Sequence, residues 1–258
     1  MVNMYAEERQ HAIVTRARDL GRVSVAELAG RFAVTPETIR RDLDTLAERG
    51  LLSRVHGGAV PADKLRLAEA PVDTRDISHP EEKLAIARRA VDLLPHREGL
   101  TLLLDGGTTT ARACALLPSW ISMVVTNSVP SAAALSARGD VDVLFIGGQV
   151  RGITQATVGA DALSVLQRLR VDVAFLGSNG FSTAHGFSTP DPAEAAIKTA
   201  MIACAREAYV LADSSKHGVD HLVQFAGLGD VELLITDRGL SASALSELTD
   251  ADLRVDRA

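Results

Sequence analysis

The sequence predicts an α/β protein in which an N-terminal winged helix-turn-helix is joined to a larger domain built on a mainly parallel sheet. Two observations predict this division. Residues 1–58 contain three short amphipathic helical segments followed by two short apolar runs around a Gly-Gly turn. From Pro80 onward, short apolar runs rich in Val, Leu and Ile alternate with helical segments, which is the pattern of a parallel sheet covered by helices.

The N-terminal helices have recognisable ends. The first is expected over residues 5–19, and the second, over residues 24–32, begins with Ser24-Val25-Ala26-Glu27, which fits a capping box. The third begins at Thr35-Pro36, with threonine as the N-cap and proline at the first helical position, and Gly50 ends it. The apolar runs on either side of the Gly-Gly turn are expected to pair as the wing.

The rest of the chain divides into a linker and a second domain. Residues 59–79 contain two prolines and no sustained periodicity, so we expect a partly extended linker there. An amphipathic helix over residues 81–94 then opens a domain covering residues 80–258. Its strands are expected to end in polar or glycine-rich turns, where ligands bind in sheets of this kind. The expected strands are residues 100–105, 122–128, 141–148, 172–180, 207–215 and 231–237.

Charge and composition exclude several classes of protein. The chain has a formal net charge of −6, which argues against bulk electrostatic binding of nucleic acid. Residues 1–58 nevertheless carry a net charge of about +1, so the acidity belongs to the remainder. No apolar run approaches the roughly 18 residues of a membrane span, and the N-terminus does not resemble a signal peptide, so a cytoplasmic protein is expected. Cys114 and Cys204 are interpreted as buried hydrophobes, and neither a metal site nor a cofactor is expected.

The third helix carries the candidates for contact with DNA. Ile39 and Leu43 are expected to face the core, which leaves polar side chains on the outer faces. A solvated helix surface is the simplest explanation of such a set, but the order of helix, turn, helix and wing favours DNA reading. The candidates are Thr35, Glu37, Thr38, Arg40 and Arg41 on the helix and Arg54 and His56 on the wing.

Polar turns at the ends of the expected strands carry the candidates for a ligand site. Each turn by itself could be an ordinary strand-to-helix cap, but several on one sheet edge favour a small phosphorylated or polyhydroxylated ligand. Lysine is rare in this chain, so each lysine is a candidate for a functional role. Lys216 is the stronger candidate because it lies in an expected strand-end loop, whereas Lys198 could pair with Glu194 at the surface. The candidates are Asp105, Gly106, Gly107, Thr108, Thr109, Thr126, Asn127, Ser128, Gly147, Gly148, Arg151, Asn179, Lys198, Asp213 and Lys216.

The motifs resemble those of one family along nearly the whole chain. The segment TPETIRRDLDTLAERGLLSRVHGGA (35–59) closely resembles the signature helix and wing of the DeoR family of bacterial transcriptional regulators. The resemblance continues through EEKLAIARRA (81–90), DGGTTT (105–110), VTNS (125–128), GG (147–148), NGF…GFSTPD (179–191), EAAIKTAM (194–201) and DSSKHG (213–218).

This resemblance implies a C-terminal domain similar in fold to ribose-5-phosphate isomerase that senses a sugar phosphate. It implies a repressor of sugar-catabolic genes that binds duplex operator DNA. Because residues 1–58 are nearly neutral, a monomer should bind DNA poorly, and a homodimer or homotetramer is expected. Two other functions remain open from the residues alone. One is a phosphosugar isomerase with an accessory N-terminal domain, although Gly177-Ser178-Asn179-Gly180 offers no carboxylate where a general base is expected. The other is a winged helix that binds protein.

Overall fold

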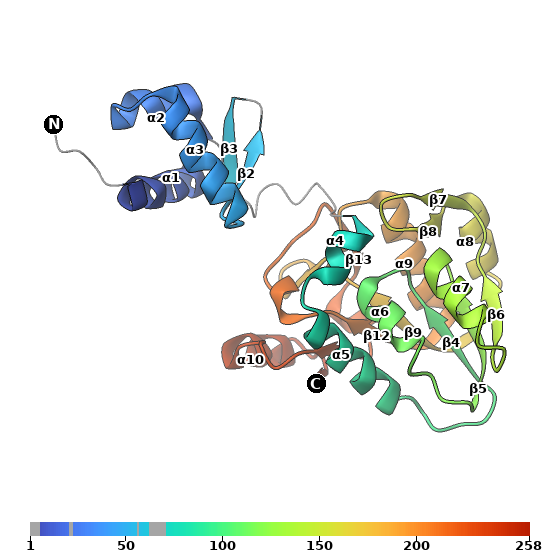
Figure 1. Cartoon of the computed structure of the whole chain (residues 1–258). Coiled ribbons are helices and arrows are strands. Elements are labelled where there is room, and N and C mark those ends of the chain that lie inside the picture. Colours follow the sequence, from blue (N-terminus) through green and yellow to red (C-terminus); the bar gives the residue numbers. More distant parts are fainter. Residues whose placement is uncertain (1–5, 21–22, 56, 62–70) are drawn as a thin grey trace. The chain divides into compact units, whose positions relative to one another are not determined.

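The computed structural model describes residues 6–20, 23–55, 57–61 and 71–258. The chain folds into two compact units, Met1–Ala68 and Glu69–Ala258 (Figure 1).

The N-terminal unit is a winged helix-turn-helix, as the sequence predicts. Its helices are α1 (Ala6–Leu20), α2 (Val25–Phe32) and α3 (Pro36–Glu48). Its antiparallel sheet has the order β1-β3-β2, with β1 (Val23–Ser24), β2 (Leu52–Val55) and β3 (Gly58–Pro61).

The predicted helix ends are present in this unit. The Ser24 side chain accepts a hydrogen bond from the Glu27 amide, and Thr35 accepts one from the Thr38 amide. The Glu27 carboxylate accepts hydrogen bonds from Arg16 of α1 instead of reaching back to Ser24, so the serine half of the predicted capping box forms and the glutamate joins α2 to α1. Gly50 follows α3 with φ +67°, a left-handed conformation that glycine adopts without strain.

A buried ion pair joins α1 to α3. Arg9 Nε donates to Asp42 Oδ2 at 2.6 Å, and Gln10 Nε2 donates to Asp42 Oδ1 at 3.0 Å. Both charged side chains are buried beside the apolar stripe of α3, whose Ile39 and Leu43 are fully buried. Asp42 therefore belongs to the core of the module, while its neighbour Arg41 is exposed.

A seven-stranded parallel sheet forms the centre of the C-terminal unit. Its order is β15-β14-β12-β9-β4-β5-β6, and every neighbouring pair is parallel. The strands are β4 (Leu100–Leu104), β5 (Ile121–Thr126), β6 (Asp142–Phe145), β9 (Val171–Gly177), β12 (Ala205–Leu211), β14 (Leu233–Thr236) and β15 (Val255–Arg257). The mainly parallel sheet predicted from the alternating pattern is confirmed.

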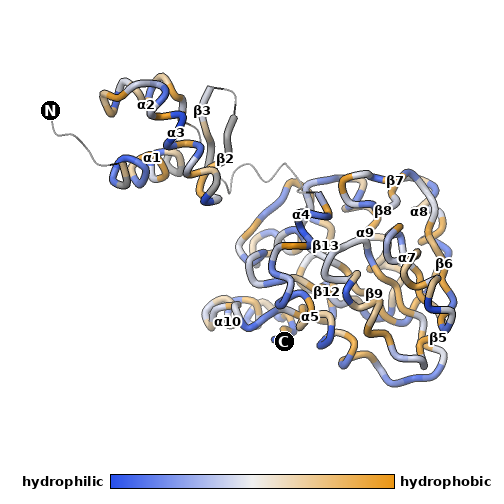
Figure 2. The backbone as a smooth tube through the Cα atoms, viewed as in Figure 1, coloured by the Kyte–Doolittle hydropathy of each residue, from blue (hydrophilic) through white to orange (hydrophobic). Residues whose placement is uncertain are grey.

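Helices cover both faces of this sheet. They are α4 (Val72–Ile77), α5 (Pro80–Asp92), α6 (Thr108–Ala113), α7 (Val129–Ser136), α8 (Ala160–Leu166), α9 (Pro192–Cys204) and α10 (Ala242–Asp250), with short 3-10 helices η2 (Ser214–Lys216) and η3 (Leu228–Asp230). Successive strand residues enter opposite cores: Leu102 and Leu104 pack with α5 and α6, whereas Leu103 packs with α8 and α9. Figure 2 shows this hydrophobic character along the strands.

Several elements differ from the sequence prediction. The run 172–180 contains β9 and then a separate strand, because the chain turns at Ser178. The expected partly extended linker, residues 59–79, begins within the strand β3 and includes the helix α4, which the sequence analysis did not predict. The additional antiparallel strands are β7 (Gln149–Arg151) paired with β8 (Ala156–Val158), and β10 (Gly180–Ser182), β11 (Gly186–Thr189) and β13 (Val223–Ala226).

The Arg9–Asp42 pair generates a stability prediction. Asp42→Asn removes the carboxylate that neutralises a buried guanidinium, so we expect the free energy of unfolding of the N-terminal unit to fall by about 3 kcal/mol. Asp44→Asn, at an exposed position on the same helix, is the matched control and should change it by less than about 1 kcal/mol. Chemical denaturation followed by circular dichroism measures both. Equal effects of the two variants would contradict the structural role of Asp42.

Candidate functional site

The carboxyl ends of β4 and β9 define the switch point of the sheet. The chain runs from β4 outward to β6 on one side and from β9 outward to β15 on the other, so the following loops diverge between these two strands. Open parallel sheets bind ligands at such a point, outside the carboxyl ends of the strands.

A cavity lies at this switch point, and we call it the first cavity. Its volume is about 50 Å³. It is lined by residues from the loops after β4, β9 and β12 and from the segment around α4 and α5: Arg75, Lys83, Gly107, Thr108, Thr109, Gly177, Ser178, Asn179, Leu211, Ala212, Asp213 and Lys216. The cations Arg75, Lys83 and Lys216 outnumber the carboxylate of Asp213 among these lining residues. The first cavity therefore suits an anion.

Six of the sequence candidates line this cavity. They come from three separate loops and are Gly107, Thr108, Thr109, Asn179, Asp213 and Lys216. The Asp213 carboxylate accepts a hydrogen bond from the Ser215 amide at 3.2 Å, which fixes the loop that carries Lys216.

Lys83 is a cavity residue that the sequence candidates do not include. It lies on α5, is 3% exposed, and donates to the backbone oxygens of Arg75 and Ser78 at the end of α4. Burial lowers the pKa of Lys83 to about 8, and the charges of Lys216 and Arg112 act in the same direction, while Asp213 and Asp76 oppose them. Its rarity as one of four lysines is the one signal that could have singled it out.

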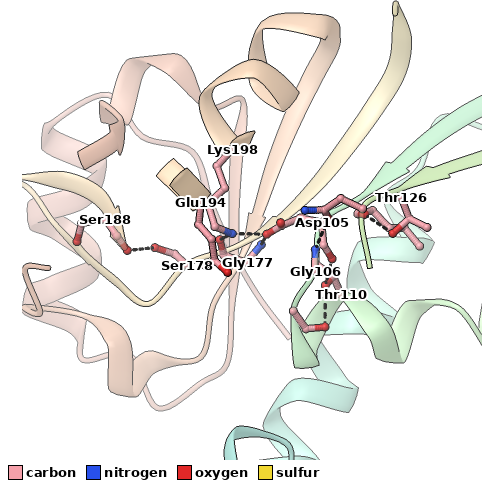
Figure 3. A network of polar contacts seen from close by, with 12 residues as sticks. Asp105, Gly106, Thr110, Thr126, Gly177, Ser178, Ser188, Glu194 and Lys198 are labelled. Carbon is pink, nitrogen blue, oxygen red and sulfur yellow. Dashed lines mark hydrogen bonds and ion pairs between the residues drawn. The ribbon is translucent and has the colours of Figure 1, made fainter. Parts of the chain in front are cut away.

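A buried ion pair next to the first cavity occupies two of the sequence candidates. Lys198 of α9 pairs with Asp105, and it also donates to the Gly177 oxygen at 2.9 Å (Figure 3). The same Asp105 oxygen accepts from the Gly177 amide at 3.0 Å. The pair thus joins the ends of β4 and β9 to α9, and Lys198 is buried and not at the surface, where the alternative interpretation of this residue had put it.

The turn after β5 makes internal contacts. Thr126 Oγ1 donates to the Leu104 oxygen at 2.7 Å, and Asn127 Oδ1 accepts from the Gly106 amide at 2.9 Å. Ser128 caps α7 by accepting a hydrogen bond from Ser131. A Cβ on Gly106 would lie 2.6 Å from the Ala156 side chain, so this glycine permits a close approach of two loops. These residues hold neighbouring loops in position by contacts within the protein, and they do not line the first cavity.

Three other candidates also lie outside the lining of the first cavity. Gly147 and Gly148 follow β6, and both are exposed. Arg151, in β7, forms ion pairs with Glu194 at 2.6 Å and Asp191 at 3.2 Å. Its role as a partner of a bound anion therefore has no support from this geometry.

The outer surface of α3 carries the candidates for DNA contact. Arg41 is exposed, Arg40 pairs with Glu37 at 3.1 Å across the helix surface, and the Thr38 hydroxyl lies 2.9 Å from that of Thr35. The side chain of Arg54 and all of His56 lie outside the described residues. Among the described residues, the candidate surface for binding nucleic acid is therefore the exposed face of α3.

Within the described residues, no group of three or more His, Cys, Asp or Glu side chains could hold a metal ion. A helix long and apolar enough to cross a bilayer is likewise absent from the described ranges.

Two family models match this chain, one in each of its two units. A family model described as the DeoR-like helix-turn-helix domain matches residues 9–64, and one described as the DeoR C terminal sensor domain matches residues 78–238. The uncharacterized HTH-type transcriptional regulator FruR of Bacillus subtilis (strain 168) is 40% identical over 235 residues, covering 91% of this chain and 92% of its own.

A second similar protein is the glycerol-3-phosphate regulon repressor of Escherichia coli (strain K12). It is 32% identical over 255 residues, covering 98% of this chain and 99% of its own. A solved structure, ribose 5-phosphate isomerase A from Neisseria gonorrhoeae, matches with 20% identity and a TM-score of 0.39 over 56% of this chain and 55% of that chain.

The Asp105–Lys198 pair can be tested by a double-mutant cycle. Asp105→Asn and Lys198→Met should each lower the free energy of unfolding of the C-terminal unit by about 3–5 kcal/mol, because each leaves a buried charge without its partner. The double variant should lose much less than the sum of the two single effects, as measured by urea denaturation. Strictly additive losses would contradict the pairing.

Proposed function

The chain belongs to the DeoR family of transcriptional regulators, and on this premise we propose that a phosphorylated sugar, bound in the first cavity, controls its affinity for operator DNA. As a member of this family it is a regulator and not an enzyme. We further propose that it represses sugar-catabolic genes and that the ligand relieves repression.

The charge of the first cavity is the observation that carries the phosphate proposal. Arg75, Lys83 and Lys216 face a space that contains one carboxylate, Asp213, and a phosphate monoester brings close to two negative charges at neutral pH. Lysine and arginine are the side chains that bind phosphate oxygens through charge-assisted hydrogen bonds. The hydroxyls of Thr108 and Thr109 offer further donors.

The attachment of α4 suggests how binding of the ligand changes the affinity of the N-terminal unit for DNA. None of the six described residues of α4 is buried, so polar contacts hold the helix in place. Lys83 binds the end of α4, and Arg112 donates both to Asp76 of α4 at 2.5 Å and to the Thr108 oxygen at 2.7 Å. A phosphate would compete with the α4 carbonyls for Lys83. In the sequence α4 comes shortly after residues 62–70, which follow β3, the last strand of the N-terminal unit. Release of α4 is therefore the step by which ligand binding would affect DNA binding.

The case for DNA binding by the N-terminal unit depends on the position of exposed side chains on α3 and not on a high positive charge. Its net charge is near zero, and Arg41 is exposed on α3 beside Thr38, where a recognition helix presents side chains to base edges. A homodimer or homotetramer would double the phosphate contacts and match a two-fold operator. The name of the glycerol-3-phosphate regulon repressor agrees with both repression and a phosphorylated ligand for this chain.

Two substitutions should separate DNA binding from ligand binding. Arg41→Ala is expected to weaken operator binding by about 1–3 kcal/mol, which corresponds to about fivefold to 150-fold, without changing thermal stabilisation by phosphorylated sugars. Lys216→Met should abolish that stabilisation while leaving operator affinity without ligand unchanged. Arg88→Ala, at an exposed position on α5, is the control for loss of a positive charge. Loss of both properties in either variant would refute the assignment of the two sites.

The lowered pKa of Lys83 makes ligand affinity depend on pH. The ammonium is charged below about pH 8 and loses its proton as the pH rises, whereas a phosphate monoester is already a dianion above pH 7. Affinity for glycerol 3-phosphate should therefore fall about tenfold between pH 7 and pH 9, measured by calorimetry. In Lys83→Arg, which stays charged, the affinity should remain flat over this range. The same fall in both proteins would show that Lys83 is not responsible.

A further inference from the structure

The exposed side of α3 carries a stripe of charged side chains that begins with a carboxylate. The stripe consists of Glu37, Arg40, Arg41 and Asp44, which are spaced at i, i+3, i+4 and i+7 and are all exposed. The apolar side chains of the helix lie on its other side, in the core of the N-terminal unit. Glu37 belongs to the first turn of α3, and Asp44 lies about 10 Å further along the helix axis.

The Glu37 carboxylate is exposed to solvent and paired with Arg40. Arg40 Nη1 donates to Glu37 Oε2 at 3.1 Å, and 63% of the Glu37 side-chain surface remains exposed. An ionised carboxylate can accept about four hydrogen bonds through its two oxygens. Arg40 therefore orients the carboxylate and leaves it able to accept a hydrogen bond from another molecule.

A carboxylate at this end of α3 opposes binding to the phosphate backbone of DNA. Residues 1–58 have a net charge of about +1, so the N-terminal unit has little positive charge to offset that repulsion. An acidic residue in the first turn also stabilises a helix, but this effect would be the same for every DNA sequence. The N-terminal residues of a recognition helix are the ones that contact base edges, and there a carboxylate can distinguish one base from another.

The four bases differ in what they offer to a carboxylate in the major groove. An ionised carboxylate accepts hydrogen bonds and donates none. Guanine and thymine present acceptors there, adenine presents a donor beside an acceptor, and cytosine presents the donor of its N4 amino group. The oxygens of guanine and thymine would repel a carboxylate, whereas cytosine gives it a donor without an adjacent acceptor. Cytosine is therefore the base that matches this side chain best.

We propose that Glu37 determines operator specificity by accepting a hydrogen bond from the N4 amino group of one cytosine in each operator half-site. Arg40 is a positioning residue that holds the carboxylate in place. Arg41 lies one turn further along the same stripe and is left to contact guanine or a phosphate group. The proposal rests on the proposed function, because it names a base that the exposed face of α3 selects in the operator.

Selection of duplexes from a random DNA pool tests this assignment with the full chain. The wild type should enrich a cytosine at one position of each half-site, and replacing it should weaken binding about tenfold, as is usual for one good base contact. Glu37→Gln should select adenine at that position, because a carboxamide matches both the donor and the acceptor of adenine. Glu37→Ala should lose the preference there. All affinities are measured at one salt concentration.

Asp44→Asn is the matched control, because it removes the same charge from the same exposed stripe about 10 Å away. It should strengthen binding to all sequences alike and leave the base preferences unchanged. Unchanged base preferences in both Glu37 variants, or the same change of preference in Asp44→Asn, would overturn the assignment of Glu37. Failure of the wild type to enrich any sequence would instead overturn the proposed operator binding.

Discussion

The buried ion pair between Asp105 and Lys198 is the contact on which the geometry of the C-terminal domain depends. It joins the ends of β4 and β9 at the point where the sheet connections diverge, and it anchors α9 to both strands. Neither charge is exposed to water, so each is stable there because of the other. The pair fixes the loops after β4 and β9, which line the first cavity, and it leaves Arg75, Lys83 and Lys216 to face a ligand.

One of these cations, Lys83, is held by groups that a ligand can replace. Lys83 is bound by backbone oxygens at the end of α4, and Arg112 connects the same helix to Thr108. Because α4 buries no apolar side chain among its described residues, these hydrogen bonds are its main attachment, and they lie beside the space where an anion is proposed to bind. A bound anion and the docked helix α4 would then compete for the same hydrogen-bond donors. Such competition is what couples ligand binding to a second site.

Local rules predicted much of this molecule from its sequence. The caps at Ser24 and Thr35 and the short apolar strands depend on neighbouring residues, and both are present in the structure. The strand-end turns were placed correctly on one edge of the sheet, although only some of their residues line the cavity. The partners of Lys198 and Lys83 could not be predicted, since Asp105 is 93 residues away from Lys198 and the α4 carbonyls carry no sequence signal.

A crystal structure of the chain with a bound phosphorylated sugar is the most direct test of this account. The account predicts the phosphate group within hydrogen-bonding distance of Lys216 and of the Thr108 and Thr109 hydroxyls, at the ends of β4 and β9. A phosphate bound instead at the Gly147–Gly148 turn or on Arg151 would contradict it.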